Sequence, residues 1–85
     1  MTENPVQTEG LEITEVEDGL VVYDPVQRRV HHLNTTAFLV FELSTGENTL
    51  ATITDVVQRV FGLEERPDAE VAAVVDKMRA ERLIR

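Results

Sequence analysis

Residues 11–23 read LEITEVEDGLVVY, and this stretch decides the fold. Apolar and polar residues alternate over 11–14, and a further apolar residue follows at Val16, which is typical of a strand with one buried face. Asp18-Gly19 is a strong hairpin signal, because glycine tolerates a positive φ. The β-branched and aromatic run 20–23 predicts a second strand. We therefore expect the chain to begin its fold as an antiparallel hairpin.

The residues that follow extend this hairpin to a meander of three strands. Residues 24–27, DPVQ, predict a turn, because proline presets φ at its second position. Residues 29–33, RVHHL, return as a third strand. His31 and His32 are adjacent in this strand, so one side chain should point toward the core and the other outward.

After residue 33 the apolar residues recur at helical spacing. Asn34 or Thr35 can cap a first helix, which residues 44–46 end. Thr49 caps a second helix with Gly62 as its stop, and Pro67 with Asp68 opens a third helix. The order βββααα predicts an α+β domain, similar to a winged helix-turn-helix, with a three-stranded antiparallel sheet followed by three helices.

The composition limits the chain to a single small domain. Its 85 residues suffice for one core, which we expect over 11–85 after a flexible N-terminal tail at 1–10. The absence of cysteine excludes disulfides, a thiolate nucleophile and a cysteine zinc site. The first ten residues lack the apolar core of a signal peptide, and no apolar run approaches the roughly 20 residues that span a bilayer. These features predict a cytoplasmic protein without a membrane partner.

The charge is strongly negative and unevenly placed. The net charge of -8 should repel phosphate backbones, which argues against nucleic acid as a partner. Residues 1–24 hold seven acids and no Lys or Arg, whereas six of the eight basic residues lie at 28–29 and 77–85. Such charges are ordinarily solvated surface, and their clustering matters only if the fold joins the two stretches.

No pattern in the sequence predicts catalysis or a bound metal. His31 and His32 point to opposite faces of one strand and have no third ligand, so they cannot easily hold one ion. Ser44 is the only serine, and it lies at a helix end without the base that a nucleophile needs. We therefore predict no catalytic residue, no metal and no cofactor, and a protein that is not an enzyme.

Two other classes of small protein share features with this chain. Acyl carrier proteins share this size and charge, but they are helical bundles with an Asp-Ser-Leu motif that this chain lacks. A winged-helix DNA-binding or regulatory domain remains the alternative, because the third helix carries basic residues. The same helix also carries several acids on a strongly acidic domain, which disfavours DNA binding.

Residues 33–43, LNTTAFLVFEL, with Gly46 close behind, resemble the PqqD family. These are small peptide-binding proteins, also called RiPP recognition elements, that serve ribosomally made and post-translationally modified peptides. Thr49-Leu50 and Phe61-Gly62 match the next family features, and the resemblance covers about residues 11–85. The chain departs from the family at Arg82, where a glycine usually precedes the terminal Leu-Ile. The last helix is then expected either to run longer or to use Arg82 as a contact.

The resemblance implies a non-catalytic adaptor that binds the leader segment of a precursor peptide. The leader would add a strand beside the third strand and touch the third helix, which is recognition by β-augmentation. The adaptor would then present it to a modifying enzyme, such as a radical SAM protein, or to a leader peptidase and cyclase in lasso-peptide systems. If one groove joins the two basic stretches, the leader should be acidic. The peptide-binding residues that the resemblance implies are Arg28, Arg29, Val30, His31, His32, Leu33, Val71, Val75, Met78, Arg79 and Arg82.

Overall fold

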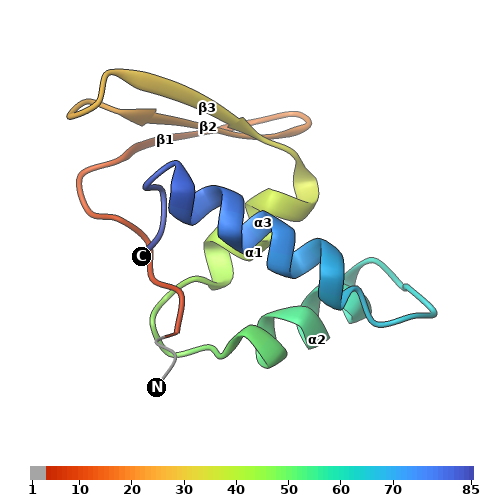
Figure 1. Ribbon diagram of the computed structural model, residues 1–85. Coiled ribbons are helices and arrows are strands. Elements are labelled where there is room, and N and C mark those ends of the chain that lie inside the picture. Colours follow the sequence, from red (N-terminus) through yellow and green to blue (C-terminus); the bar gives the residue numbers. More distant parts are fainter. Residues whose placement is uncertain (1–3) are drawn as a thin grey trace.

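A computed structural model describes residues 4–85 and confirms the α+β architecture (Figure 1). Three antiparallel strands form one sheet in the order β1-β2-β3. The three helices follow, and they lie together on one side of this sheet. The elements are β1 (Glu12–Val16), β2 (Gly19–Asp24), β3 (Arg29–Leu33), α1 (Thr35–Leu43), α2 (Leu50–Val60) and α3 (Asp68–Ala80).

Two tight turns build the sheet. Residues 17 and 18 join β1 to β2, and Gly19 follows with a φ of 152°. The turn from β2 to β3 is closed by the carboxylate of Asp24, which accepts hydrogen bonds from the backbone N–H groups of Gln27 at 3.2 Å and Val26 at 3.0 Å. These bonds lower the pKa of Asp24. The stability that Asp24 contributes is therefore present above its ordinary pKa and is lost as the pH falls through the lower folded pKa.

The helix ends follow the predicted signals. The side chain of Asn34, and not that of Thr35, caps α1 by accepting a hydrogen bond from Ala37 N–H at 2.9 Å. Thr49 caps α2 in the same way, and the Ser44 hydroxyl ends α1 by donating to the Val40 carbonyl at 2.7 Å. In the described part of the chain, no helix is both long and apolar enough to cross a membrane.

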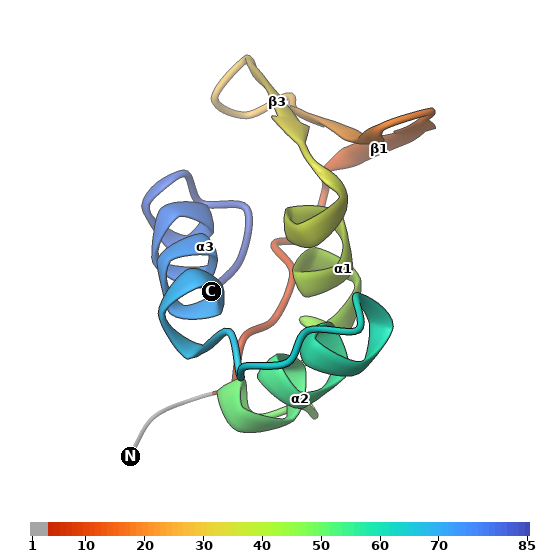
Figure 2. The ribbon, with the colours of Figure 1, turned by 90° about the vertical axis from the view of Figure 1, so that its right-hand side faces the viewer.

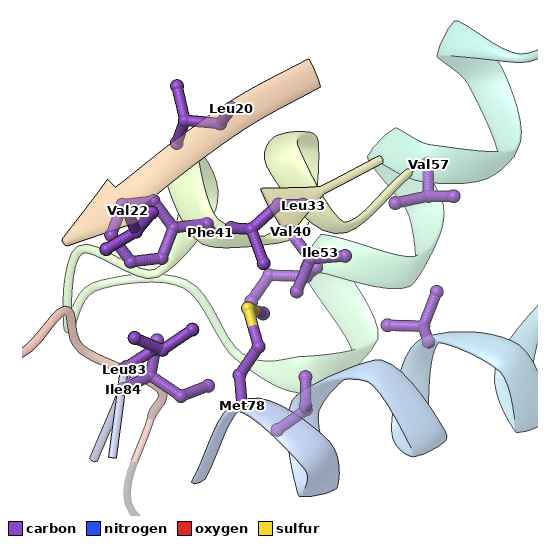
Figure 3. Packing of buried hydrophobic residues seen from close by; sticks show 12 residues of the cluster. Leu20, Val22, Leu33, Val40, Phe41, Ile53, Val57, Met78, Leu83 and Ile84 are labelled. Atoms are coloured by element: carbon purple, nitrogen blue, oxygen red, sulfur yellow. The ribbon is translucent and has the colours of Figure 1, made fainter. Parts of the chain in front are cut away.

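A single core lies between the sheet and the helices (Figure 3). Strand β2 contributes Leu20 and Val22, and Phe41 of α1 packs beneath them. Met78 of α3 reaches inward from the opposite side. The other buried apolar residues are Leu33, Val40, Ile53, Val57, Val71, Val75, Leu83 and Ile84.

Strand β1 is more exposed than its sequence predicts. Its alternation indicated one buried face, but Ile13 is 46% exposed and residues 12–15 are all solvent-exposed. The reason is the placement of the helices, because α1 packs on β2 and β3 and no helix packs on β1. The period of the strand was predicted correctly, and its burial was not.

Part of the predicted N-terminal tail is hydrogen-bonded to distant segments. Val6 exchanges two backbone hydrogen bonds with Arg85, and Gln7 N–H donates to the Ser44 carbonyl at 2.9 Å. Thr8 N–H donates to the Leu83 carbonyl at 3.0 Å. Residues 1–3 of this tail lie outside the described residues. The segment 5–8 thus fills the space between the end of α1 and the C-terminal residues.

Candidate functional site

Strand β3 is one of the two edges of the sheet. It pairs with β2 on one side, and no strand of the described residues pairs with its other side. Val30 in the middle of β3 is 66% exposed. An edge strand presents unpaired N–H and C=O groups, which form a template for another chain.

The register shows which residues of β3 present these groups. Val16 and Gly19 close the two-residue turn between β1 and β2. The closing residues of such a hairpin form a hydrogen-bonded pair, and bonded pairs alternate along an antiparallel ladder. The bonded pairs between β2 and β3 are then Leu20 with Leu33, Val22 with His31 and Asp24 with Arg29. Val30 and His32 are therefore the residues whose backbone groups point to the open edge.

A groove of about 310 Å³ lies between this edge and α3. One wall is the strand itself, residues 30–33, and Asn34 and Ala37 close one end. The opposite wall is one face of α3, formed by Val74, Lys77, Met78 and Glu81. Helix α3 packs on α1 and α2 and not on the sheet, and its ribbon stands apart from β3 in Figure 2.

One polar contact spans the groove. The Nδ1 atom of His31 lies 3.1 Å from the Oε2 atom of Glu81, and the His31 side chain is 10% exposed. Its Nε2 atom is buried and has no hydrogen-bond partner. His32 points outward, as predicted, and lies 3.3 Å from exposed Asp18. Among residues 4–85 no group of three His, Asp or Glu side chains could hold a metal ion.

The predicted site residues are only partly brought together. Residues 30–33 line the groove, whereas Arg28 and Arg29 are exposed at the start of β3. Val71 and Val75 are buried in the core, and Met78 is buried but borders the groove.

Arg79 and Arg82 lie elsewhere, in a separate hollow with Thr8, Ile84 and Arg85. Lys77 is thus the one residue of the C-terminal basic stretch that lines the groove, so the two basic stretches do not form one positive wall.

The sequence interpretation did not place Val74 or Glu81 in the groove, and it counted Lys77 only as part of the C-terminal basic stretch. All three line the α3 wall of the groove with Met78. Positions 74, 77, 78 and 81 recur at three and four residues, which places them on one face of a helix. The apolar residues at 71, 74, 75 and 78 predicted one core stripe. Residues 71, 75 and 78 are buried as expected, whereas Val74 is half-buried and borders the groove.

Comparison with known protein families supports the resemblance stated above. A family model described as "Coenzyme PQQ synthesis protein D (PqqD)" matches residues 19–84. This chain belongs to the PqqD family. Comparisons with curated proteins and with solved structures find no match, so the finer likeness to winged-helix folds stays a prediction.

Membership in the PqqD family indicates the general function of the protein. Proteins of the family are non-catalytic accessory proteins that work with a precursor peptide and a modifying enzyme in RiPP biosynthesis. The match begins at Gly19, the first residue of β2, and ends at Ile84. It therefore includes β3, the groove and α3, and it leaves out β1 and the N-terminal segment.

The structure also explains how this PqqD protein accommodates Arg82 in place of glycine. Helix α3 ends at Ala80, so it does not run longer as one expectation held. Arg82 adopts a φ of 60°, and Leu83 N–H donates to the Met78 carbonyl at 2.9 Å. Together with the bond from Arg82 N–H to the Arg79 carbonyl, this is the Schellman motif, whose left-handed position favours glycine.

Replacing Arg82 with glycine should stabilise the fold. A left-handed conformation costs a non-glycine residue about 1–2 kcal/mol, and glycine avoids this cost. Part of the resulting gain in stability is lost, because glycine increases the conformational entropy of the unfolded chain. We expect Arg82→Gly to raise the free energy of unfolding by about 0.5–1 kcal/mol in urea denaturation. Arg79→Gly, inside the same helix, should lower it by about 1 kcal/mol. A loss of stability in Arg82→Gly would contradict this assignment of the helix end.

Proposed function

We propose that this PqqD protein binds the leader segment of a precursor peptide as a fourth strand along β3 and presents it to a modifying enzyme. The observation that carries the proposal is the open edge of β3 beside a groove. Val30 and His32 offer backbone donors and acceptors at that edge, and α3 provides a wall for side chains. The modifying enzyme would be a radical SAM protein, or a leader peptidase and cyclase.

The energetics favour strand pairing supported by apolar contacts. Two outward-facing residues provide up to four backbone hydrogen bonds, each with a net contribution of about 0.5–1.5 kcal/mol. The α3 wall of the groove includes the apolar residues Val74 and Met78. Side chains of the leader that enter the groove would bury apolar surface against them at about 25 cal/mol per Å². The leader loses conformational entropy when it becomes ordered on binding, and this cost limits the affinity.

A titration with synthetic peptides tests the proposal directly. The proposed function predicts a short precursor-peptide gene beside the gene of this protein, and the probe is a fluorescein-labelled copy of the leader that it encodes. We expect saturable binding in fluorescence anisotropy, with a one-to-one stoichiometry. A scrambled copy of the same leader serves as the control for composition and charge. Equal binding of the leader and its scrambled copy would contradict sequence-specific recognition.

Lys77 should contribute to leader affinity, whereas Arg82 should not. The expectation of an acidic leader rested on several arginines in one groove, but only Lys77 lines it. We propose that an acidic residue of the strand segment pairs with Lys77. An exposed ion pair is worth about 0.2–1 kcal/mol, and the charge reversal adds a repulsion of similar size, so Lys77→Glu should weaken binding about twofold to 30-fold at low salt.

Arg82→Glu is the matched control, because Arg82 lies in the other hollow. It adds the same change of charge to the same end of the molecule. Unchanged affinity in Lys77→Glu, or an equal loss in both variants, would remove Lys77 from the binding surface.

A further inference from the structure

A second and larger hollow, of about 650 Å³, adjoins the β3 groove. Its walls come from the first residues of α1, the last turn of α2, the connection between α2 and α3, and the start of α3. None of the site residues implied by the family resemblance accounts for it, since Val71 is buried in the core and only borders it. The function proposed above also leaves it unused.

The hollow continues the groove past the end of β3. Asn34 lines the groove, and Thr35 and Thr36, which follow it directly, line the hollow. The same succession occurs on α3, where Val74 borders the groove and Glu70 borders the hollow one turn earlier. In Figure 2 the start of α1 descends from β3 beside α3, and the connection from α2 to α3 crosses below it. A peptide that leaves β3 at its Leu33 end would therefore pass over this hollow.

The centre of the hollow is apolar and partly exposed. Phe61 is 40% exposed and Leu63 is 42% exposed, although both side chains are large. Phe61 follows the last residue of α2, and its backbone N–H donates to the Val57 carbonyl at 3.1 Å, so its backbone is held at a fixed point of the fold. Exposed apolar side chains that gather in one hollow mark a contact surface.

The rim of the hollow is acidic. Glu64, Glu65 and Glu70 line it, and Arg66 is its only basic lining residue. Arg66 is already engaged, because its guanidinium contacts the carboxylates of Asp55 and Asp68 and donates to the Ala51 carbonyl at 2.9 Å. The lining therefore presents uncompensated negative charge on a chain whose net charge is -8.

We propose that this hollow is a second subsite for the leader, and that it takes an apolar side chain flanked by Lys or Arg. The inference rests on the proposed function, because the strand along β3 delivers the peptide to the hollow. The acidic rim selects a basic segment, since like charges across an interface are costly. A second copy of this chain would bring further acids to the same place, and a nucleic acid would bring phosphates. The charge thus favours the peptide as the occupant.

The experiment measures leader binding to two variants that each remove three negative charges. The first is Glu64→Gln with Glu65→Gln and Glu70→Gln, at the rim of the hollow. The second is the control, Glu12→Gln with Glu15→Gln and Glu17→Gln, around exposed strand β1. The probes are the fluorescein-labelled leader and a shortened copy that lacks the residues beyond the β3-pairing segment.

Each exposed ion pair between a rim glutamate and a Lys or Arg of the leader changes the affinity by about 1.5-fold to fivefold. The rim variant, which removes three glutamates, should therefore bind the whole leader about tenfold more weakly at low salt. The control variant should bind it as the wild type does, and the shortened leader should not distinguish the rim variant from the wild type. Equal losses in the two variants, no loss in the rim variant, or a leader without Lys or Arg in this segment would overturn the second subsite. Failure of the proposed function gives a different result, namely that neither probe binds the wild-type protein.

Discussion

Replacing Gly19 with alanine should lower the free energy of unfolding by about 3 kcal/mol or more, a large part of the roughly 4–13 kcal/mol expected for 85 residues. Gly19 has a φ of 152°, and a Cβ atom at this position would overlap the backbone carbonyl oxygen of Leu33. Neither backbone can move away easily, because Leu20 and Leu33 pair at this point and both are buried. The substitution would therefore detach β3 from β2, and urea denaturation measures the loss.

Gly62→Ala is the matched control for this prediction. Gly62 also has a positive φ, of 61°, but no atom lies within 4 Å of the position that its Cβ would take. Its replacement should cost only the conformational penalty of about 1 kcal/mol. Equal losses for the two variants would show that the close approach of Gly19 to Leu33 is not important for stability.

Replacing Val30 with proline should weaken binding of the leader about 30-fold or more while the fold persists. Proline removes the outward-facing N–H, and it leaves a carbonyl of the incoming strand without its donor, at a cost of about 1–3 kcal/mol. The fold should tolerate the change, because prolines occur on edge strands where their missing N–H faces solvent. Fluorescence anisotropy gives the affinity, and circular dichroism verifies the fold.

Two controls separate the backbone from the side chain. Val30→Ala keeps the N–H and removes only the two methyl groups, so it should cost much less than Val30→Pro. Ile13→Pro makes the equivalent backbone change on the other edge of the sheet, where Ile13 also points its N–H outward by the same alternation. It should leave leader affinity unchanged. An effect of Ile13→Pro equal to that of Val30→Pro would place the leader on β1 or on no defined edge.

The order and bounds of the elements were predictable because their signals are local. Alternation, the Asp18-Gly19 turn and the caps at Asn34 and Thr49 each act within a few residues. The burial of β1 was not predictable, since it depends on which strands the helices cover. The same holds for the hydrogen bonds of residues 5–8, whose partners lie near residues 44–46 and 83–85.

In the candidate site, too, one part was predictable from local sequence and the other part depends on tertiary packing. A meander of three strands leaves both β1 and β3 at open edges, and the family resemblance pointed to residues 30–33 of β3, which border the groove. The partner face of α3 depends on the rotation of that helix, and the stripe at Val71, Val75 and Met78 marks the face that is buried. The spacing of Lys77 and Glu81 places them with Val74 on one face of the helix, but the sequence does not show that this face, and not the face of Arg79 and Arg82, borders β3.

Amide hydrogen exchange at the two edges of the sheet tests the central claim most directly. The N–H groups of Val30 and His32 face the open edge, and the leader should cover both. The account predicts that exchange at these two amides slows by at least tenfold when saturating leader peptide is added, because a hydrogen-bonded amide exchanges only when the strand opens. Exchange at Ile13 and Glu15, on the other edge, should stay as it is. Unchanged exchange at Val30 and His32 with leader bound, or protection that instead centres on β1, would contradict the account.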